Sequence, residues 1–442
     1  TPPSLLQQRV LVSISANGST GSLEILDGLR DIRSNLQNTI HSFFISGYSG
    51  GFPTTILNFP EQLRGLVYSD TSPYGVTDIN YGTEAVIGSA GGFTARSTSI
   101  ATAPDFLRVY SAQEGAGQLQ IQDNGIPSRL YTLNLPNVYK VVVNTGDTIA
   151  LAMVRNSDTL YRVLKLNNGQ TNPPGAIDCQ PLILPVYCVV PVNGSYDRPT
   201  DAYFSTDGTT AYILNCGVEC GGGSNGGAAI SIIPQDQLNI LNIPSSATYP
   251  IVVSRTVPVP GGVTTALSDG SSLYMAGQQL QPDGLFAGRL SIMNLSTFAV
   301  STPVSISDGL HTRLLFADDN TLWIGSQSCA SGERAKLGQN YNCLTRYDLG
   351  TQAATIVPAI TTNITTNQPS VPYPNQDNNL LYLGSLTGIC WVQNYHKVYT
   401  AYGGQVHAFY TSNGAEIDNV NIAVQGTALN VAYMDALTNT AN

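Results

Sequence analysis

One unit recurs along this 442-residue chain: a short apolar stretch, a polar turn with Asp, Asn or Gly, a second apolar stretch ending in small residues, and a third alternating strand. The clearest copy is RPTDAYFSTDGTTAYILNCG, from Arg198 to Gly217, which AAISIIPQDQL continues from Ala228. Related copies begin at Thr98, Val138, Val263, His311 and Gly388. Such units, at spacings of roughly 40 to 60 residues, are typical of a β-propeller, in which each blade buries its faces only against neighbouring blades. We therefore predict an all-β, propeller-type chain.

Each copy has the local chemistry of a β-hairpin. Apolar residues alternate with small or polar ones on both sides of Asp207-Gly208, which is the period of a strand with unlike faces. Glycine tolerates positive φ and Asp bonds its own backbone, so this dipeptide predicts a tight turn. The same position in other copies holds Asp269-Gly270, Asp319-Asn320, Gly146-Asp147 and Asn394-Tyr395.

The copies predict eight four-stranded blades, with seven as the alternative. First strands are expected near Thr54, Thr98, Val138, Asp201, Val263, Arg313 and Gly388. The eighth blade is expected to be split, with a first strand from Gly426 and its other strands from residues 9–47. Pairing of 9–47 with 426–437 would close the propeller and remove a free sheet edge. We expect residues 1–442 to form a single β-propeller domain.

The composition agrees with an all-β extracellular domain. Gly 43, Pro 25 and Tyr 23 accompany a charged fraction of only 11%, and no long amphipathic pattern predicts a helix. The most apolar run, LILPVYCVVPV from Leu182, is interrupted by Pro185 and Pro191, so no transmembrane segment is expected. The chain starts at TPPSLL, and we expect that any signal peptide has been removed or omitted.

The charge balance excludes nucleic acid as an expected partner. The formal net charge is -10, and no basic stripe is present to neutralise phosphates. Neutral polar side chains dominate the expected surface. They keep it soluble, so protonation of the carboxylates changes the character of the surface little. An acidic habitat is compatible with such a surface.

The seven cysteines favour an oxidising compartment. We expect local disulfides between Cys179 and Cys188, Cys216 and Cys220, and Cys329 and Cys343, because each partner is the nearest cysteine in sequence. A metal site is the alternative for Cys216-x3-Cys220, but no second Cys or His pair lies nearby at zinc spacing. Cys390 is left over beside Trp391, where a buried small hydrophobe is favoured over a nucleophile.

Formal catalytic motifs fail on their context. Ser49 in GYSGG and Ser224 in GGSNG both match the G-x-S-x-G pattern, but a nucleophile elbow needs a strand before the serine and a helix after it. The run GGGSNG from Gly221 matches G-x-G-x-x-G but leads into a strand, so no helix N-terminus awaits a phosphate. We assign no catalytic residue and expect no cofactor.

A weak ligand site is predicted at the channel mouth. His311 and Arg313 stand at the start of one expected innermost strand, and Arg198 and Asp201 stand at the corresponding place of another. Such groups can bind a polar ligand or a metal, and the alternative is that they are solvated loop residues. The clusters Asp318-Asp319-Asn320 and 375–378 lack the ligand spacing of a calcium loop and are interpreted as turns, so no metal site is expected.

The repeats resemble those of YVTN-type surface propellers. Tyr212-Ile213-Leu214-Asn215 stands where that family has Tyr-Val-Thr-Asn, 273–276 (Leu-Tyr-Met-Ala) is a looser match, and 322–325 (Leu-Trp-Ile-Gly) departs further. The resemblance covers about half of the chain and implies a secreted or cell-surface protein. Lactonase-like relatives of the family imply a hydrolytic activity, but no catalytic position of this chain matches theirs.

Taken together, these features predict a secreted or cell-surface propeller that serves as a binding or structural module without chemistry of its own. The expected partners are a surface protein, a glycan or further copies of the chain. The alternative is a hydrolase, lactonase-like, that acts on a sugar or lactone in the central funnel with groups such as His311, Arg313 and Arg198.

Overall fold

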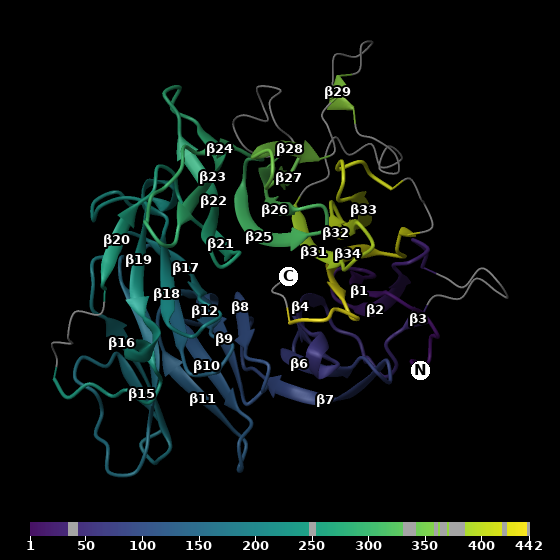
Figure 1. Ribbon diagram of the computed structural model, residues 1–442. Helices are drawn as coiled ribbons and strands as arrows, with labels where there is room; N and C mark the ends of the chain where they lie inside the picture. Colours follow the sequence, from purple (N-terminus) through teal and green to yellow (C-terminus); the bar gives the residue numbers. More distant parts are fainter. Residues whose placement is uncertain are drawn as a thin grey trace. The chain divides into compact units, whose positions relative to one another are not determined.

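A computed structural model describes residues 1–33, 43–246, 253–329, 342–357, 361–362, 369–370, 385–417 and 422–439. The chain is a β-propeller with eight blades, as the repeats predict, and not with seven (Figure 1). Every predicted first strand is confirmed: the innermost strands are β4, β8, β12, β17, β21, β25, β31 and β34. Helix is confined to short turns: η1 (Pro60–Gln62), η2 (Glu114–Ala116), η3 (Gly217–Cys220) and α1 (Gln235–Leu238).

The chain divides into two compact units, of which the first comprises Thr1–Ser89, Gln281–Arg289 and Val304–Asn442. Its closing blade has the order β3 (Phe43–Phe44), β2 (Gly21–Asp27), β1 (Arg9–Ser15), β34 (Thr427–Tyr433). The β4 blade has β4 (Pro53–Phe59), β5 (Arg64–Ser69), β6 (Gly75–Asn80) and β7 (Ala85–Gly92). The β25 blade has β25 (Leu310–Ala317), β26 (Thr321–Gln327), β27 (Leu344–Asp348) and β28 (Ala353–Val357). The β31 blade has β31 (Leu386–Val392), β32 (Lys397–Tyr402) and β33 (Gln405–Tyr410), and a separate pair is formed by β29 (Thr361–Thr362) and β30 (Pro369–Ser370).

The second unit comprises Ala90–Leu280 and Leu290–Pro303. The β8 blade has β8 (Ser99–Thr102), β9 (Arg108–Gln113), β10 (Gln118–Asp123) and β11 (Arg129–Asn134). The β12 blade has β12 (Val138–Val143), β13 (Ala150–Val154), β14 (Leu160–Leu166), β16 (Val186–Val192) and β15 (Asp178–Gln180). The β17 blade has β17 (Pro199–Phe204), β18 (Thr210–Asn215), β19 (Ala229–Pro234) and β20 (Arg255–Pro258). The β21 blade, which is divided between the units, has β21 (Thr265–Ser268), β22 (Ser272–Leu280), β23 (Phe286–Asn294) and β24 (Val304–Ser305).

Two blades depart from the predicted four strands. The β31 blade has three strands among the residues that the structure describes, and the β12 blade has five. The fifth strand, β15, arises because the segment that holds Cys179 folds back on β16, with Cys179 directly opposite Cys188. The disulfide joins the two strands at this pair, and residues 181–185 form the tip of the hairpin.

The predicted turns have the backbone that their residues favour. Positive φ values occur at Gly208, Gly270, Asp147, Asn394 and the Asp319–Asn320 pair. The Asp207 carboxylate accepts hydrogen bonds from the Ser205 hydroxyl at 2.6 Å and the Thr209 amide at 3.0 Å. These bonds lower the pKa of Asp207 and hold the hairpin that joins β17 to β18.

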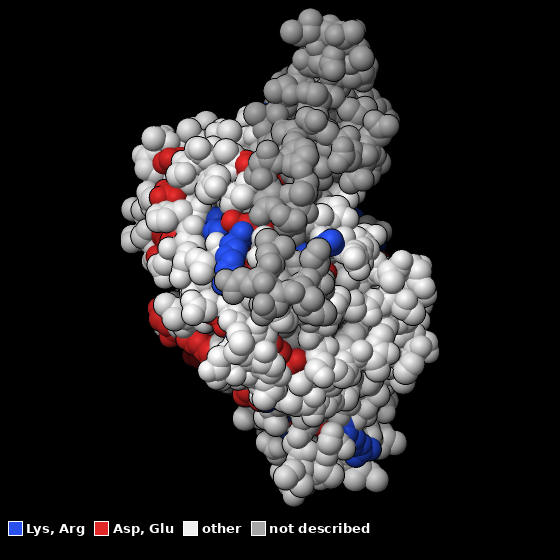
Figure 2. Space-filling model, turned by 90° about the vertical axis from the view of Figure 1, so that its right-hand side faces the viewer, with Lys and Arg blue, Asp and Glu red and all other residues white. Residues whose placement is uncertain are grey.

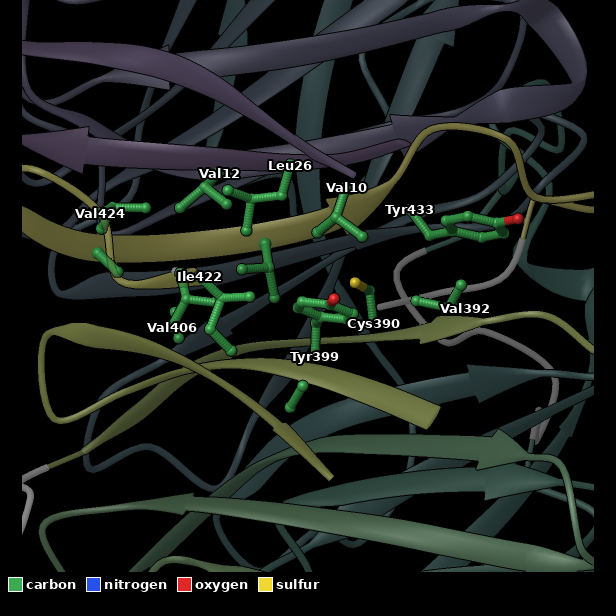
Figure 3. Close-up of a cluster of buried hydrophobic side chains, with 14 of the residues drawn as sticks. Val10, Val12, Leu26, Cys390, Val392, Tyr399, Val406, Ile422, Val424 and Tyr433 are labelled. Carbon is green, nitrogen blue, oxygen red and sulfur yellow. The ribbon is translucent and has the colours of Figure 1, made fainter. Parts of the chain in front are cut away.

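Most of the hydrophobic clusters lie between neighbouring blades, and one lies within the β12 blade. One cluster combines Val12 of the closing blade with Cys390 and Tyr399 of the β31 blade (Figure 3). Val431 of β34 belongs to the same cluster. Other clusters join the β8 and β12 blades, the β12 and β17 blades, and the β25 and β31 blades. Each blade therefore depends on the next to bury its apolar face, which explains why the repeat occurs as an array.

The two ends of the chain meet in the closing blade, as predicted. Strand β34 pairs antiparallel with β1 (Figure 1). In this pair Val12 lies opposite Val431. Both side chains are fully buried. The register shifts between Ser13 and Ile14, where a β-bulge bends the pair.

Val12→Ala is expected to lower the free energy of unfolding by about 2 kcal/mol, because it removes two buried carbon groups from this core. Val218→Ala is the matched control, since Val218 is 50% exposed, and should change stability by less than about 0.5 kcal/mol. Urea unfolding followed by fluorescence measures both. Equal losses in the two variants would contradict the assigned core.

Candidate functional site

A pocket of about 610 Å³ lies in the first unit, where three distant segments meet. It is formed by the residues before β1, the turn between β31 and β32, and the end of β34 with the residues that follow. The lining residues are Pro2, Leu6, Gln7, Gln8, Arg9, Gln393, Asn394, Tyr395, Tyr433, Asp435 and Leu437. Its volume falls in the range of about 300–1,000 Å³ that is usual for ligand pockets.

The charged groups of this pocket neutralise one another. Asp435 accepts hydrogen bonds from the Arg9 backbone N–H at 2.7 Å and from Arg9 Nη2 at 2.6 Å. The other terminal nitrogen of the Arg9 guanidinium, Nη1, donates to the Tyr81 carbonyl at 2.5 Å and to Glu84 at 3.0 Å. Burial lowers the pKa of Arg9, but the bonds and charges of Asp435 and Glu84 raise it by more. The guanidinium thus stays charged and fixed.

A glutamine joins two tyrosines on the pocket wall. Gln8 donates from Nε2 to the Tyr395 hydroxyl at 2.9 Å, and the Tyr433 hydroxyl donates to Gln8 Oε1. Burial, followed by the nearby Asp435 charge, raises the pKa of Tyr433, so its phenol stays neutral at any biological pH. The wall therefore offers hydroxyl and amide groups rather than ionised ones.

Gln393 supplies a further amide at the pocket. It is 7% exposed, and its Oε1 accepts the Leu437 backbone N–H at 2.8 Å. Its Nε2 bonds no residue of the described part of the chain. Because Gln393 lines the pocket and its Nε2 is not enclosed by protein, this amide is a candidate for ligand contact.

The sequence did not single out these pocket residues. Asn394-Tyr395 was interpreted only as a hairpin turn, and Gln8 lies outside any repeat copy. Gln8 and Tyr395 are 387 positions apart, so only the predicted pairing of the chain ends could have indicated that they meet.

The four residues predicted at the channel mouth each bond a neighbour within their own unit. Arg198 pairs with Asp158 at 2.8 Å, and Asp201 pairs with Lys140 at 2.7 Å. Arg313 donates to the Thr387 carbonyl at 3.0 Å. Arg198 and Asp201 belong to the second unit, whereas His311 and Arg313 belong to the first.

His311 is not a solvated loop residue, which corrects one of the two interpretations considered for it. It lies in β25 beside a bulge, is fully buried, and bonds the Ser307 carbonyl through Nε2 at 2.7 Å. Burial lowers the pKa of His311 to about 4, outweighing the opposite effect of that hydrogen bond. The ring is therefore neutral at physiological pH.

The two serines of the G-x-S-x-G matches lie outside a strand–turn–helix setting. Ser49 is in the loop between β3 and β4 and lines a hollow of about 700 Å³ whose lining has Ser, Thr, Gly, Pro and Val but no His, Asp or Glu. Ser224 lies in the Gly-rich loop that leads into β19. The lining of the hollow at Ser49 thus holds no base that would activate a nucleophile.

Three disulfides link the predicted pairs: Cys179 to Cys188, Cys216 to Cys220 and Cys329 to Cys343. Cys390 is free and fully buried, beside Tyr399 on the neighbouring strand (Figure 3). Burial raises the pKa of this thiol, which disfavours the reactive thiolate. It packs as a small hydrophobe.

The described residues hold no group of three or more His, Cys, Asp and Glu side chains that could bind a metal ion. Of the helices that the structure describes, none has the length and apolarity to cross a membrane. The predicted acidic turn at 375–378 lies outside the described residues.

The fold is similar to that of solved propellers. The structure described as dihydro-heme d1 dehydrogenase NirN in complex with DHE matches with a TM-score of 0.56 and 13% identity, over 98% of this chain and 77% of that one. Kuenenia stuttgartiensis hydrazine synthase matches with a TM-score of 0.47 and 13% identity, over 88% and 99% of the two chains. The Cps50 (Swd1) β-propeller domain of Myceliophteria thermophila matches with 0.46 and 12%, over 85% and 99%.

At 13% identity the first of these likenesses supports the fold alone. No family model matches the chain. No curated protein matches it at a significant level. The YVTN-type resemblance therefore stays a prediction, whereas the propeller fold that it implied is confirmed.

Peptide mapping under non-reducing conditions is expected to recover the three local disulfides and one free thiol, Cys390. The thiol should react with an alkylating reagent only after unfolding, because it is buried. Two or more additional free thiols in the native protein would refute the pairing.

His311→Gln is expected to change how stability depends on pH. The pKa of His311 is about 4 in the folded protein and about 6.5 when unfolded. Its stabilising contribution is thus fully present above pH 6.5 and is lost as the pH falls through about 4. Glutamine retains an N–H for the Ser307 carbonyl but does not titrate.

The wild-type protein should therefore lose about 3 kcal/mol of stability relative to His311→Gln between pH 7.5 and pH 4. Urea unfolding of both proteins at each pH measures this difference. Parallel curves would show that His311 is not buried in a neutral form.

Proposed function

We propose that this chain is an extracellular or cell-surface β-propeller, one domain over residues 1–442, that acts as a non-enzymatic binding module. The observation that carries the proposal is the pocket at the end of β34, with its internally paired charges and neutral polar wall. Three disulfides favour an oxidising compartment. The sparsely charged face in Figure 2 fits contacts made through neutral groups.

The geometry favours binding over the alternative of a sugar or lactone hydrolase. A general base needs a lone pair free to accept a proton from the reacting group. In this pocket both oxygens of Asp435 accept hydrogen bonds from Arg9, and Arg9 is also bonded to Glu84. The titratable groups are thus committed to holding the structure together.

The channel mouth at Arg198, Asp201, His311 and Arg313 remains the competing ligand site. We favour the pocket because Arg198 and Asp201 are in ion pairs, Arg313 bonds a backbone carbonyl and His311 is fully buried. Tyr395 also bonds a neighbour through its hydroxyl, but it exposes 36% of its surface at the pocket rim.

A screen of compounds by thermal shift, followed by calorimetry, tests this choice. A bound compound is expected to lose about ten-fold in affinity in Tyr395→Ala, which removes a ring and a hydrogen-bonding hydroxyl. Arg198→Ala should leave its affinity unchanged. Loss of affinity in Arg198→Ala but not in Tyr395→Ala would place the binding site at the channel mouth instead. Hydrolysis of a bound compound would favour the alternative function, a hydrolase.

Assembly with further protein copies is a second candidate function, and a specific surface favours it. The tip of the β15–β16 hairpin exposes Leu182 by 90% and Ile183 by 76%, with the Cys179–Cys188 disulfide fixing its base. No Lys or Arg occurs from residue 166 to 197, so attraction to an acidic lipid surface has no source here. Such exposed apolar side chains mark protein contacts.

The Leu182→Ser/Ile183→Ser double variant is expected to abolish concentration-dependent self-association in sedimentation velocity. Ile126→Ser is the matched control, because Ile126 is fully exposed on a different turn. If the control and the double variant sediment alike, the hairpin tip is not an assembly contact.

A further inference from the structure

The side chains that line the pocket at the end of β34 indicate a ligand class. We propose that this pocket binds a neutral, hydroxyl-rich ligand, namely a short uncharged glycan. The inference rests on the proposed function, because it names the ligand class of the same site. It is drawn from charge, from hydrogen-bonding capacity and from the aromatic rim.

Charge excludes the ionic ligand classes. The only cation of the lining, Arg9, has a side chain that is 5% exposed and pairs on both sides with carboxylates. An anionic ligand would find no free positive charge, and the chain as a whole carries -10. A cationic ligand would have to compete with Arg9 for Asp435, whose oxygens already accept four hydrogen bonds from it.

The hydrogen-bonding capacity matches hydroxyl groups. A sugar hydroxyl both donates and accepts, and a carboxamide offers both functions in one plane. Four amides line the pocket, from Gln7, Gln8, Gln393 and Asn394. The Nε2 of Gln393 bonds no described residue and is not enclosed by protein, so it can donate to a hydroxyl oxygen of the ligand in place of water.

The rim adds an aromatic face. Tyr395 is half-exposed at the β31–β32 turn, and Gln8 fixes its hydroxyl at 2.9 Å. The negative face of an aromatic ring attracts the partially positive C–H groups of a sugar ring. Because Gln8 also bonds Tyr433, the two phenols and the amide form a preorganised wall that loses little freedom on binding.

Isothermal titration calorimetry with the full chain tests the proposal. The neutral probes are maltotriose, cellotriose, mannotriose and tri-N-acetylchitotriose, and the charged probes are trigalacturonate and the chitosan trimer. At least one neutral probe should bind, with an affinity that changes less than two-fold between low and high salt. Tyr395→Ala and Gln393→Glu should each weaken it by about ten-fold.

Gln393→Glu retains the acceptor for the Leu437 amide but loses the donor, so it separates ligand contact from loop structure. Tyr410→Ala is the matched control, because Tyr410 is 44% exposed on β33 and does not line the pocket. It should bind as the wild type does. Thermal unfolding of each variant verifies that it is folded.

The results distinguish a wrong ligand class from a wrong binding pocket. Binding of only a charged probe, lost in Tyr395→Ala, would overturn the ligand class and leave the binding pocket in place. The same conclusion follows if no trisaccharide binds but a compound from the wider screen does so in a Tyr395-dependent way. Glycan binding that Tyr395→Ala leaves intact, or the absence of any bound compound, would overturn both proposals.

Discussion

The buried guanidinium of Arg9 holds together the parts of the chain on which the first unit depends. It stands at the start of β1, bonds Asp435 just beyond β34, and reaches the Tyr81 carbonyl and Glu84 next to the β4 blade. Removing one partner of a buried ion pair leaves an uncompensated charge, which costs about 3–5 kcal/mol. The pairing of β1 with β34 brings Arg9 and Asp435 together, and their ion pair in turn fixes the end of that pairing.

The same interaction shapes the candidate site. If Arg9 were free, the pocket would be a basic site that selects anions, and if Asp435 were free, it would attract cations. Because Arg9 and Asp435 bond each other, the amides and phenols around them decide which ligand the pocket selects. A single ion pair thus links the closure of the closing blade with the chemistry of its pocket.

Much of the fold could be predicted because its determinants are local. Asp207-Gly208 and its counterparts predict hairpins because of their own side chains and φ preferences. The paired cysteines could be predicted because residues close in sequence are close in space. The burial of His311 was missed because a strand start resembles a solvated loop end. The fifth strand β15 was missed because a disulfide-bounded segment of ten residues fits either a loop or a hairpin. The pocket required long-range pairing that no local pattern encodes.

The closing blade has a consequence for biosynthesis. Arg9 and Asp435 are 426 positions apart, so β1 leaves the ribosome long before the strand that covers its inner edge. At about 5–20 residues per second, the open edge of β1 waits for tens of seconds. During that interval it offers unpaired backbone groups and the apolar Val10 and Val12 to any other strand. The closing blade is therefore completed only when β34 has been made, long after its strands β1 and β2.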